Sequence, residues 1–200
     1  MTVVEVYGFL VAGAERASCD AFDTHVVASI VSLGLLQSQQ DASPTRSLGL
    51  SAAELVELAE LVFPHAAHLF AGLAPELPLS PSEDQRRLHE LLFMGSNQGS
   101  RFEFLLAGLI ARRAKEPNHL WQDLGLRHRR ELSWLMSRHF EAIAARNTQD
   151  MKWKKFLYRL ICCDEAFALC VAPSCAECDD RARCFGEEDG ESLVPTAPTA

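Results

Sequence analysis

The sequence predicts an all-α protein: a helical bundle followed by a C-terminal cysteine-rich, metal-binding loop. Apolar residues recur at the spacing of a helix face through most of the chain. Helix-capping patterns such as Ser51-Ala-Ala-Glu54 precede several of these stretches. No stretch of useful length alternates apolar and polar residues as a strand would. With 200 residues the chain can bury one core, which we assign to residues 1–168.

Six helices are expected, and each begins or ends at a recognisable signal. Their approximate ranges are 21–36, 51–64, 81–94, 100–115, 129–146 and 151–168. Asp20 can cap the first helix, and the polar residues 37–47 after it predict a loop. Ser51 opens the second helix with a capping box, and Pro64 ends it.

The later helices are bounded by the same kinds of signal. The pattern at 80–83, Ser-Pro-Ser-Glu, repeats the capping device with a proline in the first helical turn. Glycines at 95–99 end that helix, and Ser100 can cap the next one. Glu116-Pro117 prevents continuation, because the residue before a proline disfavours the helical conformation. Asp150 is the expected cap of the last helix.

The charge of the chain is unevenly distributed. The formal net charge is −8, yet residues 127–159 hold nine Lys and Arg against three acids, a local charge of +6. The rest of the chain therefore carries −14. A patch of one sign on a body of the other attracts small anions or an acidic partner surface. A set of solvated helix faces is the alternative interpretation.

The composition also excludes several classes of protein. No run of about 18 apolar residues is present, so we expect no membrane-spanning helix. Residues 1–14 lack the Lys or Arg that opens a secretory signal, and a cytoplasmic location is expected. The negative net charge and the absence of a nucleic-acid-binding motif argue against nucleic acid as a partner.

Six of the seven cysteines lie between Cys162 and Cys184, a cluster that indicates a metal site rather than disulfides joining distant parts of a fold. The four candidate ligands have the spacing C-x4-C-x2-C-x5-C and are Cys170, Cys175, Cys178 and Cys184. We expect residues 169–186 to form a loop that metal binding orders and that packs on the bundle. The acidic, then Pro/Thr/Ala-rich tail 187–200 is expected to be disordered.

The spacing favours an iron–sulfur cluster over zinc. Structural zinc sites usually present two C-x2-C pairs separated by about a dozen residues or more, and only one such pair is present here. Zn–S bonds of about 2.3 Å also bring four sulfurs closer together than a cuboidal cluster requires. A zinc-stabilised interaction module and a conventional four-iron electron-transfer protein remain the alternatives.

Other candidate residues lie upstream of the cysteines. Lys152, Lys155 and Arg159 fall on one helix face and could bind an anion or an acidic partner. His119 and Asp123 are four residues apart and would line up in a helix, as a metal-binding histidine and its carboxylate partner do. Four further residues are expected in the core, namely Cys19 and the three tryptophans Trp121, Trp134 and Trp153.

Together, these segments make the chain resemble the NifQ family of nitrogen-fixation proteins. The resemblance covers about the C-terminal 40% of the chain and rests on motifs in a fixed order. They are Asn118-His-Leu-Trp-Gln-Asp-Leu-Gly-Leu126, Glu131-Leu-Ser-Trp-Leu-Met136, His139-Phe140, Ala145-Arg-Asn147, Asp150-Met-Lys-Trp-Lys-Lys-Phe-Leu-Tyr-Arg159, and Ala172-Pro-Ser-Cys175 within the four-cysteine pattern that ends at Cys184-Phe-Gly186. The N-terminal half resembles the family only as a set of amphipathic helices.

The resemblance implies a function. Members of the family are thought to bind an iron–sulfur cluster, of three or four irons, that incorporates molybdenum. They are thought to donate this molybdenum to the assembly of the iron–molybdenum cofactor of nitrogenase. The implied partners are the cofactor-assembly scaffold, the nitrogenase iron protein, and molybdate or another molybdenum source. A carrier of this kind is not an enzyme, so no catalytic residues are expected.

Overall fold

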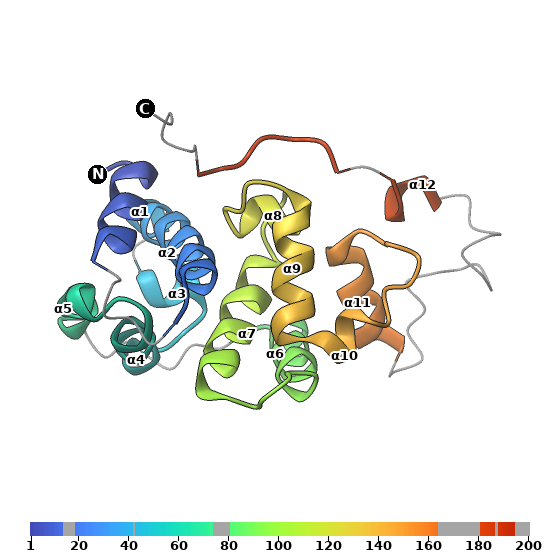
Figure 1. The fold of residues 1–200 in the computed structure, drawn as a ribbon, viewed down its shortest axis with the longest axis horizontal. Coiled ribbons are helices and arrows are strands. Elements are labelled where there is room, and N and C mark those ends of the chain that lie inside the picture. The colour runs from blue at the N-terminus through green and yellow to red at the C-terminus, as the bar shows by residue number, and fades with distance from the viewer. Residues whose placement is uncertain (14–18, 42, 74–80, 164–180, 187, 195–200) are drawn as a thin grey trace.

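The computed structural model describes residues 1–13, 19–41, 43–73, 81–163, 181–186 and 188–194. These residues form helices and connections without any strand, which confirms the all-α prediction (Figure 1). The elements are α1 (Val3–Ala12), α2 (Ala21–Asp41), α3 (Pro44–Leu48), α4 (Ala52–Val62), the 3-10 helix η2 (Pro64–Ala66), α5 (His68–Ala71), α6 (Glu83–Met94), α7 (Arg101–Arg113), α8 (Leu120–Asp123), α9 (Arg129–His139), α10 (Glu141–Ala144), α11 (Trp153–Cys163) and α12 (Arg181–Cys184).

Helix α7 lies at the centre of the bundle. It packs against α6, α3 and α4, and its residues from Leu105 to Ala111 are fully or almost fully buried. A helix that is apolar on nearly every side must be surrounded by other helices, as α7 is. On the far side of α6 the contacts continue to α11, so the core extends to the helix beside the cysteine-rich segment (Figure 1).

The predicted capping signals position several helices. Asp20 Oδ1 accepts hydrogen bonds from the N–H groups of Phe22 and Asp23, both at 3.0 Å. Reciprocal capping boxes open α4 at Ser51 and α7 at Ser100. At α6 the cap is Ser82, whose hydroxyl oxygen accepts from the Gln85 N–H, and the helix begins at Glu83, two residues later than the proline pattern suggested.

The helices differ from the sequence expectations in several places. The predicted loop 37–47 is wrong, because α2 continues to Asp41 and Pro44 opens α3. Proline is favourable in the first turn of a helix, so Pro44 starts α3 instead of breaking structure. The single helix expected over 129–146 is interrupted at Phe140, which has non-helical backbone angles and is fully buried. Helix α1 was not predicted at all.

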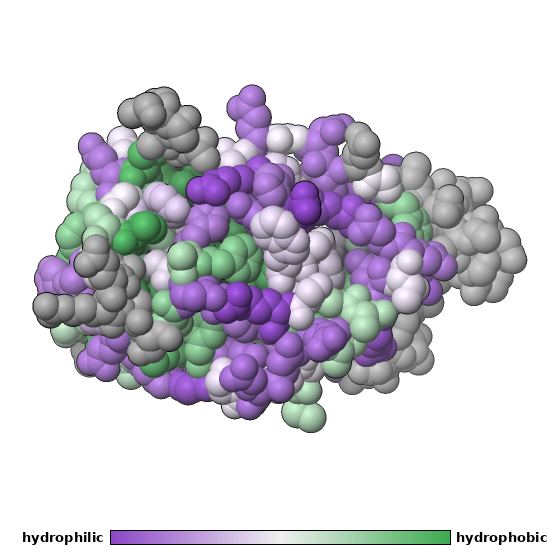
Figure 2. Space-filling model, viewed as in Figure 1, coloured by the Kyte–Doolittle hydropathy of each residue, from purple (hydrophilic) through white to green (hydrophobic). Residues whose placement is uncertain are grey.

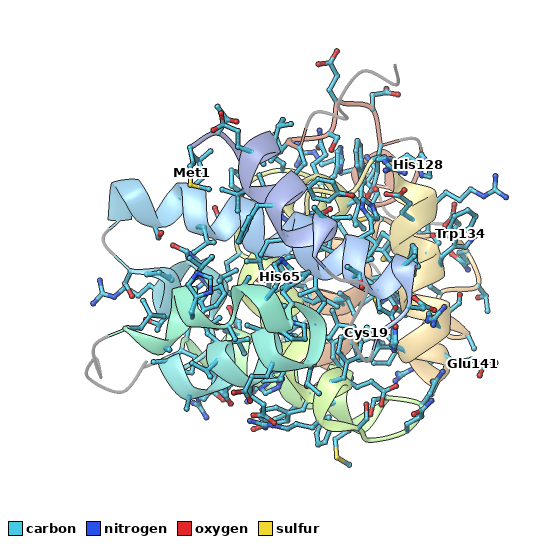
Figure 3. The ribbon with its side chains drawn as sticks, turned by 60° about the vertical axis from the view of Figure 1, so that its left-hand side comes forward. Met1, Cys19, His65, His128, Trp134 and Glu141 are labelled. Atoms are coloured by element: carbon cyan, nitrogen blue, oxygen red, sulfur yellow. The ribbon has the colours of Figure 1, made fainter. Side chains whose placement is uncertain are left out.

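Two of the three tryptophans are core residues as predicted. Trp121 and Trp153 are buried, whereas Trp134 is 49% exposed on the outer side of α9 (Figure 3). There Trp134 contacts the Phe22 ring edge-on, and the Arg130 guanidinium lies 4.9 Å above its ring. These contacts cover part of the indole without burying it.

The described part of the tail, residues 188–194, lies along the bundle (Figure 1). Gln122 Nε2 donates to the Glu191 carbonyl at 3.0 Å. Val194 is buried against Val3 and Leu33. Gly125, with φ of +72°, leaves room for this contact, since a Cβ at this position would come within 2.8 Å of Val194. The composition of the tail reveals neither the buried valine nor the hydrogen bond to its backbone, and the disorder expected for 187–200 stays a prediction.

Polar side chains cover most of the visible surface over α8 to α10, and the most strongly hydrophobic exposed residues lie over the N-terminal helices (Figure 2). The exposed apolar residues there are Phe9, Val11 and Leu69. Within the described residues, none of the helices combines the length and apolar character needed to cross a membrane.

Candidate metal-cluster site

The structure places one of the four predicted cysteine ligands. Cys184 ends α12 and is partly buried against the core. Cys170, Cys175 and Cys178 lie outside the described residues. Among the described residues, no group of three or more His, Cys, Asp and Glu side chains is arranged to hold a metal ion. The four-cysteine site therefore stays a prediction from the spacing.

Cys184 is fixed beside the start of the basic helix. The N–H of Lys152, the residue immediately before α11, donates to the Cys184 carbonyl at 2.8 Å. Phe185 follows and also packs against the core. These contacts join the backbone at Cys184 to the start of α11.

Helix α11 has the two-sided character that its sequence predicts. Its apolar side is buried, with Trp153, Phe156 and Leu157 in the core. Of the predicted anion-binding residues, Lys155 is exposed, whereas Lys152 and Arg159 are partly buried.

Lys154, which the sequence analysis did not single out, anchors α11 to the loop before α8. Its ammonium group forms an ion pair with Asp123, which is fully buried. It also donates to the carbonyls of Glu116 at 2.5 Å and Asn118 at 2.6 Å. The Asn118 side-chain amide donates to the other Asp123 oxygen at 3.0 Å. Two of the motifs that carry the family resemblance thus meet at one buried charge pair.

The connection before α11 is held in an unusual backbone conformation. Asp150 has φ of +54°, a left-handed value that is costly for a residue other than glycine. Arg129 donates two hydrogen bonds to the Asp150 carboxylate, at 2.8 and 3.0 Å, and one to the Met151 carbonyl at 3.0 Å. Asn147 makes two further hydrogen bonds to the Met151 backbone, both at 2.9 Å. These contacts fix the direction in which α11 and Lys152 leave the loop.

His119 does not pair with Asp123 as the four-residue spacing suggested. His119 precedes α8 with extended backbone angles, so its side chain does not share a helix face with Asp123. Its Nδ1 instead lies 3.5 Å from Oε1 of Glu188. Arg129 Nε lies 3.5 Å from the other oxygen of Glu188, whose side chain is only 2% exposed. Burial raises the pKa of the Glu188 carboxyl, although the positive charges of Arg129 and His119 oppose this rise.

Cys19 and His139 belong to a separate, structural cluster. Burial, with the Asp23 carboxylate nearby, raises the pKa of the Cys19 thiol to about 11, which makes it a poor thiolate ligand. His139 is buried between Asp23, whose Oδ1 lies 2.9 Å from Nε2, and Glu103. Cys19 therefore has the structural role that the sequence suggested.

Internal ion pairs reduce the predicted patch of positive charge. Pairs with carboxylates among the described residues involve at least four of its nine cations, namely Arg127, Arg129, Arg138 and Lys154. Glu131, the partner of Arg127, also accepts from the Arg127 N–H and lies 3.4 Å from His25 Nε2. Burial would raise the pKa of Glu131, but these interactions more than offset it and lower the pKa. Lys155, on α11, is exposed, and Lys152 just before α11 is partly buried.

Comparison with known proteins identifies the family of the chain. The family model described as NifQ matches residues 26–186, which include the loop, α11 and all four cysteines. The "Protein NifQ homolog" of Sinorhizobium fredii (strain NBRC 101917 / NGR234) is 40% identical over 176 residues, which cover 87% of this chain and 76% of that protein. "Protein NifQ" of Rhodobacter capsulatus is 39% identical, over 80% of this chain and 87% of that protein.

"Protein NifQ" of Azotobacter vinelandii is 32% identical, over 70% of this chain and 78% of that protein. No solved structure matches the fold. The family match extends well beyond the C-terminal motifs, because it begins in α2 and includes the central helix α7. The chain belongs to the NifQ family of nitrogen-fixation proteins.

Proposed function

We propose that this protein carries an iron–sulfur cluster that incorporates molybdenum, and that it donates the molybdenum to assembly of the nitrogenase iron–molybdenum cofactor. The cluster is cargo, and the protein is a carrier without catalytic turnover. Its ligands are the four cysteines at C-x4-C-x2-C-x5-C spacing, Cys170, Cys175, Cys178 and Cys184. Soft thiolates select such clusters, and family membership supports molybdenum as the second metal.

The observation that carries the proposal is the hydrogen bond between the Lys152 N–H and the Cys184 carbonyl. It joins the last cysteine of the pattern to the start of the basic helix. A thiolate-bound cluster is negatively charged, and we expect the Lys152 ammonium group to offset part of that charge. The same cation would attract an incoming oxyanion such as molybdate.

The exposed Lys155 lies one turn further along α11 and is available to an approaching partner. The recipients that the family resemblance implies are the cofactor-assembly scaffold and the nitrogenase iron protein. An acidic surface on either of them would meet Lys155 and the rest of this basic face during transfer.

A cysteine replacement tests the ligand assignment. Anaerobic reconstitution of the full chain with iron and sulfide should give the visible thiolate-to-iron absorption in the wild type, and Cys184→Ala should lose most of it. Cys19→Ala is the matched control, because Cys19 is also partly buried but belongs to the structural cluster. Equal absorption in the two variants would remove Cys184 from the ligand set.

A charge replacement tests the role of the basic face. Lys152→Ala combined with Lys155→Ala should lower the molybdenum taken up per chain when molybdate is supplied with iron and sulfide. The iron content should stay close to that of the wild type, since the cysteines are intact. Unchanged molybdenum uptake would show that the basic face has no part in loading.

A further inference from the structure

The carboxylate of Glu188 lies beside the candidate cluster site, close to His119 and Arg129. Its two oxygens lie 3.5 Å from His119 Nδ1 and 3.5 Å from Arg129 Nε. Lys152 is close enough to lower the pKa of Glu188, and Asp150 raises it. The carboxylate therefore faces nitrogen-bearing side chains from three different parts of the chain: His119 before α8, Arg129 at the start of α9 and Lys152 before α11.

The fit between the carboxylate and these cations is incomplete. Arg129 Nε and Glu188 Oε2 are both buried, and neither has a hydrogen-bond partner among the described residues. At 3.5 Å they attract each other as charges, but the geometry is not that of a hydrogen bond. A buried donor without an acceptor is costly, so this position favours an anion that reaches the Arg129 N–H better than Glu188 does.

The charges lead to the same conclusion. With Glu188 ionised, Arg129 and Lys152 are balanced by Asp150 and Glu188. Withdrawal of Glu188 leaves one net positive charge in a partly buried position. An anion must then replace the carboxylate. A tetrahedral oxyanion has oxygens further apart than those of a carboxylate, and it can approach His119 and Arg129 together.

We propose that His119, Arg129 and Lys152 form an oxyanion-binding site that the Glu188 carboxylate occupies until the anion displaces it. Glu188 lies two residues beyond the region matched by the family model, whereas His119, Arg129 and Lys152 lie inside it. The site is adjacent to Cys184, because Lys152 contributes both to the site and to the hydrogen bond with the Cys184 carbonyl. The identification of the natural anion as molybdate rests on the proposed function.

Anion binding to the full-length protein, measured by titration calorimetry with molybdate and with sulfate, tests the site. Glu188→Gln keeps the size of the side chain and removes its charge. The control is Asp189→Asn, which makes the same change of net charge at the exposed neighbouring residue. If Glu188 leaves the site open about one-tenth of the time, its removal tightens binding about tenfold. Adding Lys152→Gln to Glu188→Gln should abolish that gain.

Equal affinities of Glu188→Gln and Asp189→Asn for both anions would overturn the proposal. A lower melting temperature of Glu188→Gln without any gain in anion affinity would also overturn it, because Glu188 would then only stabilise the fold. A gain for sulfate alone would overturn the assignment to molybdate. The assay contains no iron. If Glu188→Gln binds anions tenfold more tightly but the protein loads no cluster, the carrier function is rejected and this site is not. If the protein loads a normal cluster but Glu188→Gln gains no anion affinity, only this site is rejected.

Discussion

The buried ion pair of Lys154 and Asp123 should be essential for the stability of the region around α11. Lys154→Met keeps most of the aliphatic chain and removes the ammonium group. It leaves the fully buried Asp123 carboxylate without its cation, and it removes the donor to the Glu116 and Asn118 carbonyls. Loss of one partner of a buried pair is much more costly than loss of an exposed pair.

We expect the free energy of unfolding to fall by about 3 kcal/mol, near the lower end of the range of about 3–5 kcal/mol for breaking a buried pair. The lower end applies because Asn118 still donates to Asp123 and the positive charge of Arg113 lies nearby. For a chain of this size the melting temperature should fall by about 6–12 °C. Urea unfolding followed by far-UV circular dichroism measures the change directly.

The matched control is Lys155→Met, which removes the same charge from the next residue, where the side chain is exposed. It should change stability by less than about 0.5 kcal/mol. In a double-mutant cycle, Asp123→Asn and Lys154→Met together should destabilise by about 2 kcal/mol less than the sum of the single changes. Equal effects of Lys154→Met and Lys155→Met, or strictly additive effects in the cycle, would refute the reasoning.

Other contacts give predictions of their own. Ser100→Ala removes the cap of the central helix α7 and should cost about 1 kcal/mol in urea unfolding; no measurable loss would show that this cap is dispensable. Glu131→Gln should destabilise at pH 7, because burial raises the pKa of Glu131 but its hydrogen bonds and ion pairs lower it further. The stabilisation from a lowered pKa is lost as the pH falls from 4.5 through the folded value, so the difference from wild type should narrow there; a constant difference would contradict this. Cys178→Ala should prevent cluster loading and retain the helical content, whereas the control Cys19→Ala should load the cluster fully. Global unfolding of Cys178→Ala would show that the cysteine segment is needed for the stability of the whole fold.

Local signals allowed much of the fold to be predicted, because capping acts within a few residues. Ser51 and Ser100 bond to residues three positions away, so their sequence patterns contain all the information that the structure uses. The continuation of α2 to Asp41 was missed because polar composition was taken as loop composition. The break at Phe140 was missed because a buried aromatic side chain, rather than a glycine or proline, interrupts the helix.

The contacts around the candidate site depend on tertiary structure and were harder to predict. Helical spacing grouped Lys152, Lys155 and Arg159, but it could not reveal that Lys154 pairs with Asp123, 31 residues away in sequence. A signal was present, since Lys154 lies three and seven residues before Leu157 and Ile161, two buried residues on the same side of α11. Glu188 gave no such signal, because an acid in an acidic tail looks like a solvated residue.

The metal content of the protein tests the central claim most directly. The full chain should be purified without oxygen and supplied with iron, sulfide and molybdate, after which iron, molybdenum and zinc per chain are measured. We expect several irons per chain with a smaller amount of molybdenum, and both metals should be lost when Cys175 or Cys178 is replaced by Ala. About one tightly held zinc, with no iron and no visible absorption, would contradict it and show a zinc-stabilised helical module. A stable cluster that cycles reversibly between redox states and takes up no molybdenum would instead indicate an electron-transfer protein.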